Sequence, residues 1–154
     1  MTPTAIALLK IFEGFRPQPY GDPIGLRTIG FGHRVLSGED WSKGITPTEA
    51  EILLVKDFEL HKSAVVSGLG GKHAEEWELE AMTSLCFNVG PAKFLGSTLL
   101  KLFCSGNRRG AAMEFLKWVN AGGAPYPGLV KRRNIECIWF LGAADQILLD
   151  FVKR

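Results

Sequence analysis

The stretch Glu13-Gly-Phe-Arg-Pro-Gln-Pro-Tyr-Gly-Asp-Pro-Ile-Gly-Leu-Arg-Thr-Ile-Gly-Phe-Gly-His33 decides the fold of this chain. It begins with a carboxylic acid at the end of an apolar, helix-like pattern and passes through two prolines into a glycine-rich turn that carries Asp22. Leu26 to Phe31 is a short β-branched and aromatic run that is typical of a strand. Two carboxyl groups in different surroundings suit general acid and base catalysis.

A helix is predicted just before this stretch. Thr2 can cap it, with Pro3 in the first position, where the missing N–H has no helical partner to lose. Gly14 ends the helix and leaves Glu13 at its C-terminus, where negative backbone partial charges disfavour ionisation. A general acid needs a carboxyl group that stays protonated. The apolar residues at helical spacing are Ala5, Leu8, Leu9 and Phe12.

The rest of the chain is predicted to be mostly helical. After a polar loop over residues 35–45, Thr46-Pro47-Thr48-Glu49 has the pattern of a capping box and predicts a helix of about twenty residues that ends near Gly68. Short loops then separate five further predicted helices. Their expected bounds are 76–87, 97–103, 108–119, 129–141 and 143–152.

Length and composition predict one globular domain of 154 residues, 46% hydrophobic and 22% charged. The net charge of +2 is unevenly spread. Residues 1–77 hold eight Lys/Arg against ten Asp/Glu, or −2, and residues 78–154 hold ten against six, or +4. A basic half suits a polyanion such as nucleic acid or a wall polymer, but a solvated helical surface explains it at least as well.

The basic triplet Lys131-Arg132-Arg133 has the same two interpretations. It could contact phosphates, but a solvated face with one buried ion pair is the more common arrangement. The neighbouring Trp139 and Phe140 are typical of a core and not of base stacking. Binding to nucleic acid is therefore not predicted.

Cys86, Cys104 and Cys137 lie in apolar helical patterns without metal-site spacing. We expect buried, reduced thiols, which indicate folding in a reducing compartment. No apolar run approaches the length of a membrane span, and the N-terminus lacks the pattern of a signal peptide. Neither a metal nor a cofactor is expected.

Spacing alone does not establish catalysis by Glu13 and Asp22. A helix-terminal Glu and an Asp before proline in a turn are common surface residues. Thr28 could hold a water molecule, but β-branched residues also simply favour strands. His33 could be an acid, a base or a metal ligand, but a lone histidine is more often a hydrogen-bonded structural residue. On these patterns alone, ordinary structural roles are the more common outcome.

The same stretch resembles the catalytic signature of phage-type lysozymes, the endolysins of glycoside hydrolase family 24. The matching residues are Glu13-Gly-Phe-Arg, Tyr20-x-Asp22 and Gly25-x-x-Thr28-Ile-Gly-Phe-Gly-His33. Their Glu, Asp and Thr keep the family's spacing of nine and then six residues. Similar motifs cover nearly the whole chain: Ile45-Thr-Pro-Thr-Glu-Ala-Glu51, Phe87-Asn88-Val89-Gly90, Ser97-Thr98-Leu99-Leu100 and Pro127-Gly128-Leu129-Val130-Lys-Arg-Arg133.

The resemblance implies hydrolysis of the β-1,4 bond between N-acetylmuramic acid and N-acetylglucosamine in bacterial peptidoglycan, which releases phage progeny by host cell lysis. Glu13 would be the general acid, Asp22 the base or electrostatic stabiliser, and Thr28 would position the water. The family is described as inverting, which requires a carboxyl separation of ~6.5–9.5 Å in place of ~5–5.5 Å.

The resemblance also assigns residues around this triplet. His33 and Asp57 match a structural ion pair between the strand region and the long helix. Substrate-binding positions in the cleft are matched by Phe87, Asn88, Ser97 and Arg34. Position 34 departs from the family pattern, because relatives commonly have Thr or Leu there.

The fold implied is α+β and lysozyme-like, in a single domain over residues 1–154. Residues 15–45 would form a small β-containing lobe and residues 46–68 a connecting helix. Residues 1–14 and 72–154 would form the helical lobe, with the cleft between the lobes.

The implied partners are the glycan strands of peptidoglycan, without stable membrane association, for a protein expected to be a monomer. Some relatives carry an N-terminal membrane-release anchor, whereas this chain starts directly at its first helix. The expectation is therefore an endolysin that stays in the host cytoplasm until lysis and then reaches the periplasm and cell wall. A holin would give the protein access to the cell wall without contacting it directly.

Two other functions compete with hydrolysis. A lytic transglycosylase needs only one catalytic acid and forms an anhydro product. A non-catalytic wall-binding or virion protein could use an inactivated lysozyme fold. The presence of Asp22 and Thr28 beside Glu13 favours hydrolysis over both.

Overall fold

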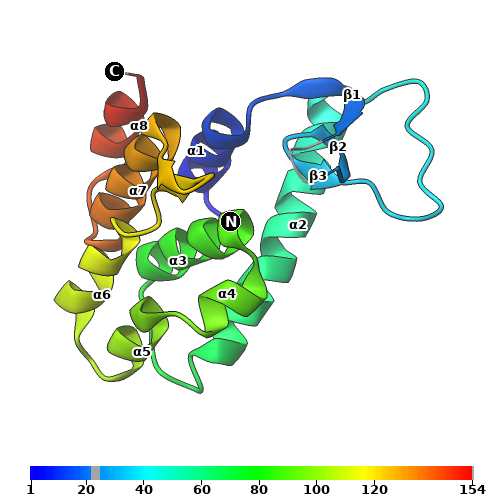
Figure 1. Cartoon of the computed structure of the whole chain (residues 1–154). Coiled ribbons are helices and arrows are strands. Elements are labelled where there is room, and N and C mark those ends of the chain that lie inside the picture. Colours follow the sequence, from blue (N-terminus) through cyan, green and yellow to red (C-terminus); the bar gives the residue numbers. More distant parts are fainter. Residues whose placement is uncertain (22–24, 154) are drawn as a thin grey trace. The chain divides into compact units, whose positions relative to one another are not determined.

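The computed structural model describes residues 1–21 and 25–153. The chain divides into two compact units, Met1–Glu59 and Leu60–Arg154. The long helix α2, Pro47–Gly68, contributes residues to both units (Figure 1).

The first unit opens with helix α1, Pro3–Glu13. Thr2 Oγ1 accepts a hydrogen bond from the Ala5 amide at 3.2 Å, which satisfies one of the free donors at the helix start. Gly14 has a φ of 67° and ends the helix by donating its amide to the Lys10 carbonyl. The predicted bounds of this helix are confirmed.

Three antiparallel strands follow in the order β1-β2-β3. They are β1 (Arg16–Gly21), β2 (Arg27–Gly30) and β3 (His33–Arg34). Pro17 and Pro19 lie in the edge strand β1, where a missing N–H costs no central hydrogen bond. The register between β1 and β2 shifts between Arg16 and Tyr20, over the segment that holds both prolines.

Helix α2 begins at a capping box, as predicted. The Thr46 amide donates to Glu49 Oε2 at 2.8 Å, and the Glu49 amide donates to Thr46 Oγ1 at 3.3 Å. Strand β2 packs against this first turn, because a Cβ atom at Gly30 would lie 2.9 Å from the Cβ of Ala50. Glycine at position 30 therefore permits the strand and the helix to touch.

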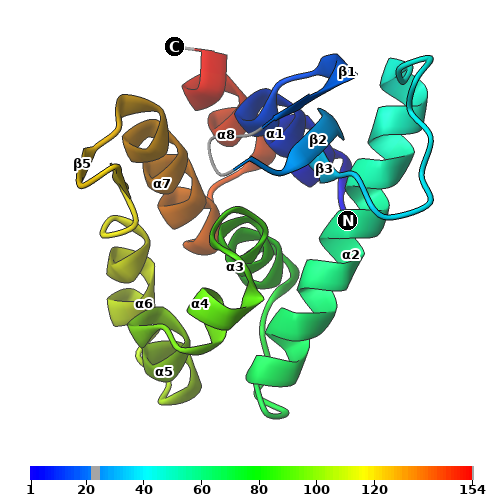
Figure 2. The ribbon, with the colours of Figure 1, turned by 45° about the vertical axis from the view of Figure 1, so that its right-hand side comes forward.

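The second unit begins within α2 and continues in the helices that follow it (Figure 2). They are α3 (Glu76–Val89), α4 (Pro91–Leu95), α5 (Thr98–Cys104), α6 (Arg108–Phe115), α7 (Pro127–Phe140) and α8 (Asp145–Lys153). Helix α7 contacts α3, α6 and α8, and α6 also packs on α5. The rings of Phe103 and Phe115 both contact that of Phe140 in the core.

Two details of this unit correct the predictions. The helix predicted over 108–119 ends at Phe115, and the predicted loop after it contains a small hairpin, β4 (Asn120–Ala121) and β5 (Ala124–Pro125). The Tyr126 amide donates to the Val119 carbonyl across this hairpin at 2.8 Å, a spacing of seven residues that does not belong to a helix. Helix α4 was not predicted, because its five residues are too few for a periodic pattern.

The basic triplet points largely inward. Arg132 and Arg133 are buried, and both pair with the fully buried carboxylate of Glu136. Ser84 Oγ donates to the same carboxylate at 2.6 Å. Lys131 remains exposed and donates to a backbone carbonyl of α8. Two guanidinium groups thus share one carboxylate inside the unit.

The free cysteines fit the prediction for Cys86 and Cys137, which are buried. Burial raises the pKa of Cys86 to about 11 and raises that of Cys137 as well. Cys104 is only half-buried, so the prediction was wrong for this residue. It lies in α5 with its sulfur 3.9 Å from the Gly68 and Leu69 carbonyls.

Candidate active site

Glu13 is the last residue of α1 and is half-buried. A Cβ atom built on Gly32, whose φ is +81°, would lie 3.3 Å from Glu13 Oε2. The carboxyl group therefore rests on the backbone of the turn between β2 and β3. Glycine at position 32 provides both the left-handed conformation and the space that this contact needs.

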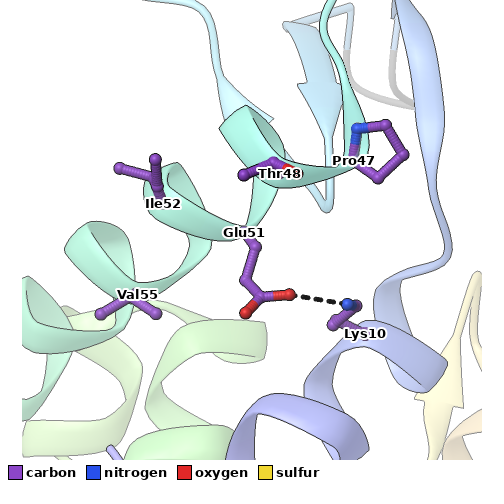
Figure 3. A pocket seen from close by; sticks show the side chains of 6 residues that line it. All are labelled: Lys10, Pro47, Thr48, Glu51, Ile52 and Val55. Carbon is purple, nitrogen blue, oxygen red and sulfur yellow. Dashed lines mark hydrogen bonds and ion pairs between the residues drawn. The ribbon is translucent and has the colours of Figure 1, made fainter.

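Contacts from Lys10 hold the last turn of α1 in place. Lys10 Nζ donates to Glu51 Oε2 of α2 at 2.7 Å and lies 5.4 Å from the centre of the Phe31 ring. The ion pair forms one wall of a pocket of about 450 Å³ (Figure 3). The pocket is lined by Lys10, Pro47, Thr48, Glu51, Ile52 and Val55.

The two other members of the predicted catalytic triplet are Asp22 and Thr28. Asp22 lies outside the described residues. Thr28 is buried in β2, pairs with Tyr20 across the sheet, and donates its hydroxyl to the Tyr20 carbonyl at 3.4 Å. That hydrogen bond is long, so the hydroxyl is only weakly engaged.

His33 is buried in β3 between two carboxylates. Its Nδ1 lies 2.7 Å from Asp57 Oδ2 of α2, and its Nε2 lies 3.1 Å from Glu39 Oε2 in the loop after β3. Burial by itself lowers the pKa of His33, but the hydrogen bonds and negative charges of Asp57 and Glu39 raise it above its ordinary value. The ring is thus stabilised in its charged form.

Glu39 is the residue that sequence reasoning missed. Its Oε2 also accepts from the Leu36 amide at 2.9 Å and from Trp41 Nε1 at 3.2 Å. Burial raises the pKa of Glu39, but these hydrogen bonds and the one to His33 lower it by more, to below its ordinary value. A Glu in a polar loop has no pattern that distinguishes it, because its partner is brought to it by the fold.

The predicted substrate-binding residues are spread over several elements. Arg34 is exposed in β3. Phe87 and Asn88 are neighbours near the end of α3, where the Phe87 ring lies 5.0 Å from the His61 ring. Ser97 is buried, and its Oγ caps α5 by accepting from the Leu100 amide at 3.1 Å.

Asn88 belongs to a polar pocket of the second unit. Its Oδ1 accepts from Arg133, and it lines a pocket of about 500 Å³. The other lining residues are Val89, Lys93, Lys117, Trp118, Asn120, Leu129 and Arg133. Lysine, arginine and asparagine side chains here can donate hydrogen bonds to an oxygen-rich ligand.

No group of three or more His, Cys, Asp or Glu side chains in the described part of the chain could hold a metal ion. No helix among these residues is long and apolar enough to cross a membrane.

Comparison with known proteins places this geometry in context. The family described as phage lysozyme matches residues 10–136. The SAR-endolysin of bacteriophage PS119 is 36% identical over 132 residues, which cover 82% of this chain and 77% of that protein.

Two solved structures are similar over nearly their whole length. The muramidase domain of SpmX from Asticaccaulis excentricus is 30% identical, with a TM-score of 0.79 and coverage of 92% of this chain and 97% of that one. A point mutant of the phage P22 lysozyme is 34% identical, with a TM-score of 0.76 and coverage of 92% and 98%. The predicted lysozyme-like α+β fold is confirmed, and the chain belongs to the phage lysozyme family.

Proposed function

We propose that this protein is an endolysin that hydrolyses the β-1,4 bond between N-acetylmuramic acid and N-acetylglucosamine in peptidoglycan. Glu13 is the general acid, Asp22 the base or electrostatic stabiliser, and Thr28 a positioner of the attacking water. The observation that carries the proposal is the half-buried Glu13 carboxyl group resting on Gly32 at the end of α1. A general acid needs such a fixed position to reach the glycosidic oxygen.

The family and the names of its members support this function. Relatives are named endolysin, and one structural neighbour is named a muramidase domain. Endolysins act on the cell wall, so the glycan strands of peptidoglycan are the proposed substrate. We propose that the protein acts as a monomer, without metal or cofactor, from the host cytoplasm after a holin gives access to the wall.

In the proposed mechanism, Glu13 protonates the leaving oxygen while Asp22 acts from the opposite face of the sugar. A water molecule held with the help of Thr28 attacks the anomeric carbon, which inverts its configuration. This outcome requires ~6.5–9.5 Å between the two carboxyl groups, whereas ~5–5.5 Å would favour a covalent intermediate. Asp22 accepts the proton that the attacking water releases.

Four side chains are proposed to hold the glycan strand. Phe87 offers a partly exposed ring face, and Asn88 and Arg34 offer amide and guanidinium donors at the surface. Ser97 accepts a cap hydrogen bond, and its hydroxyl can also donate to a ligand. The His33–Asp57 pair is assigned a structural role.

A Glu13→Gln variant tests the proposal against wild type in a turbidity assay on permeabilised cells. Loss of general acid catalysis is expected to slow lysis by about 10²–10⁴-fold. Glu76→Gln, an exposed carboxylate in the first turn of α3, is the matched control and should lyse at the wild-type rate. Wild type that is as inert as Glu13→Gln would favour a non-catalytic wall-binding or virion protein.

Mass spectrometry of the released muropeptides separates hydrolysis from the lytic transglycosylase alternative. Reducing-end products are expected, because water attacks the sugar. A 1,6-anhydro product would contradict hydrolysis, since it forms when the sugar's own hydroxyl attacks. An anomer-resolved NMR time course then reads the configuration of the new reducing end.

A further inference from the structure

The loop over residues 35–45 is fastened by the side chain of Glu39. One oxygen of this carboxylate faces three N–H groups, from Leu36, Trp41 and the His33 ring. The first two bonds lie within the loop and shape it around the carboxylate. The third joins the loop to β3, so Glu39 attaches a surface loop to the buried ring of His33.

His33 fixes the turn between β2 and β3 that supports Glu13. Its ring is held from α2 by Asp57 and from the loop by Glu39. The preceding residue is Gly32, the backbone on which the Glu13 carboxyl group rests. On the other side of the turn, Gly30 is packed against α2. The support under Glu13 is thus anchored at both ends.

We infer that Glu39 is a positioning residue for the general acid: by holding the His33 ring, it keeps the turn beneath Glu13 in its active arrangement. The inference rests on the proposed function of Glu13. Glu39 would make no contact with the reacting atoms and would act by fixing the position of the Glu13 carboxyl group.

The chemistry of imidazole makes this support sensitive to pH. The charged ring donates from both nitrogens, whereas the neutral ring keeps a single N–H. Among the described residues, the charged side chains that face the ring are Asp57 from α2 and Glu39 from the loop. Asp57 is closer, at 2.7 against 3.1 Å, and less exposed, so the remaining proton stays on Nδ1. Glu39 then loses the hydrogen bond from His33 Nε2. The attachment of the loop to β3 is therefore the first of the two contacts to be lost.

NMR of the whole protein tests the inference together with the lysis assay over the same pH range. The titrations followed are those of the His33 ring and the Gly32 amide, beside the alkaline limb of the lytic rate. The ring and the amide should share one midpoint in wild type, whereas the alkaline limb of the lytic rate also contains the ionisation of the proposed acid Glu13. Glu39→Gln weakens the hold on the charged ring, so it should move the ring and amide midpoints to lower pH by the same interval and shift the alkaline limb in the same direction.

Asp40→Asn is the matched control. It removes the same charge from the adjacent residue, whose carboxylate bonds the Ser42 amide and not His33, so it should move none of the three midpoints. Equal shifts in Asp40→Asn and Glu39→Gln would overturn the inference. So would a Glu39→Gln variant in which the His33 midpoint moves while the Gly32 amide and the lytic limb stay.

A second variant covers the case in which Glu39→Gln does not fold. Trp41→Phe removes one of the hydrogen bonds that hold the Glu39 carboxylate beside His33 and keeps its charge, so looser positioning should give a smaller shift in the same direction. An inert wild type would instead count against the proposed lytic function. The ring and amide titrations would still decide whether Glu39 sets the turn, because they need no activity.

Discussion

Gly32 is constrained by two independent requirements. Its φ of +81° is unfavourable for any side chain, and the space beside its Cα is filled by the Glu13 carboxyl group. Gly106, between α5 and α6, has a φ of +86° but nothing within 4 Å of a Cβ atom built there. Both glycines occupy the left-handed region, and of the two only Gly32 has the contact with Glu13.

Gly32→Ala and Gly106→Ala should each destabilise the protein by about 1–2 kcal/mol, because both place a side chain in the left-handed region. Only Gly32→Ala should also slow lysis, since its methyl group displaces the proposed acid. Urea unfolding and the turbidity assay measure the two effects. Equal lytic rates in the two variants would show that the Glu13 contact has no part in activity.

The His33 clasp, the ring held between Asp57 and Glu39, gives stability a predicted pH dependence. A pKa that is raised in the folded state means that the clasp stabilises fully below the unfolded pKa of about 6.5 and that this stabilisation is lost as pH rises through the folded value. Urea unfolding from pH 5.5 to 9 should show this decline. Asp57→Asn should make this decline smaller, because it removes a charge-assisted hydrogen bond worth about 1.5–3 kcal/mol.

Asp150→Asn is the comparison for that variant. Its carboxylate is exposed on α8, and its distance to Lys153 Nζ is 4.0 Å. Surface pairs of this kind contribute little, so the pH dependence should stay that of wild type. A decline that survives Asp57→Asn unchanged would mean that another group titrates.

At the scale of elements, the caps explain why the long helix could be predicted. Thr46→Ala removes the hydroxyl that both accepts from the Glu49 amide and donates to the Glu49 carboxylate, so it should cost about 1 kcal/mol. Thr48→Ala, in the first turn of the same helix and exposed, should be neutral or slightly stabilising because alanine favours helices. Thermal unfolding measures both; equal losses would contradict a capping role.

Local signals such as these caps predicted α1 and α2 because the residues that decide them are close in sequence. Glu13 and His33 also stood out, through a motif that is contiguous. Glu39 did not, since its bond to His33 depends on how the loop folds back. The β4–β5 hairpin was missed for a similar reason: the Val119 to Tyr126 hydrogen bond that closes it leaves no periodic pattern in the sequence.

At the scale of the whole molecule, the charge surplus of the second half has an internal component. Arg132 and Arg133 both pair with the carboxylate of Glu136, and all three side chains are buried. Glu136→Gln would remove a buried negative charge that both guanidinium groups contact, which should cost about 3–5 kcal/mol. Far-UV circular dichroism during urea unfolding measures the loss.

Glu114→Gln is the control for that variant. Its partner Lys117 is 69% exposed, so breaking this pair should cost under about 1 kcal/mol. Similar losses in the two variants would mean that the buried cluster contributes no more than a surface pair.

The three thiols are natural probes of local unfolding in the second unit. All of them lie between residues 86 and 137, and none lies in Met1–Glu59. The half-buried Cys104 should be labelled first by a thiol reagent, while Cys86, with its pKa of about 11, reacts only when α3 separates from its neighbours. The order and speed of labelling would therefore time the opening of this half of the protein without any added probe.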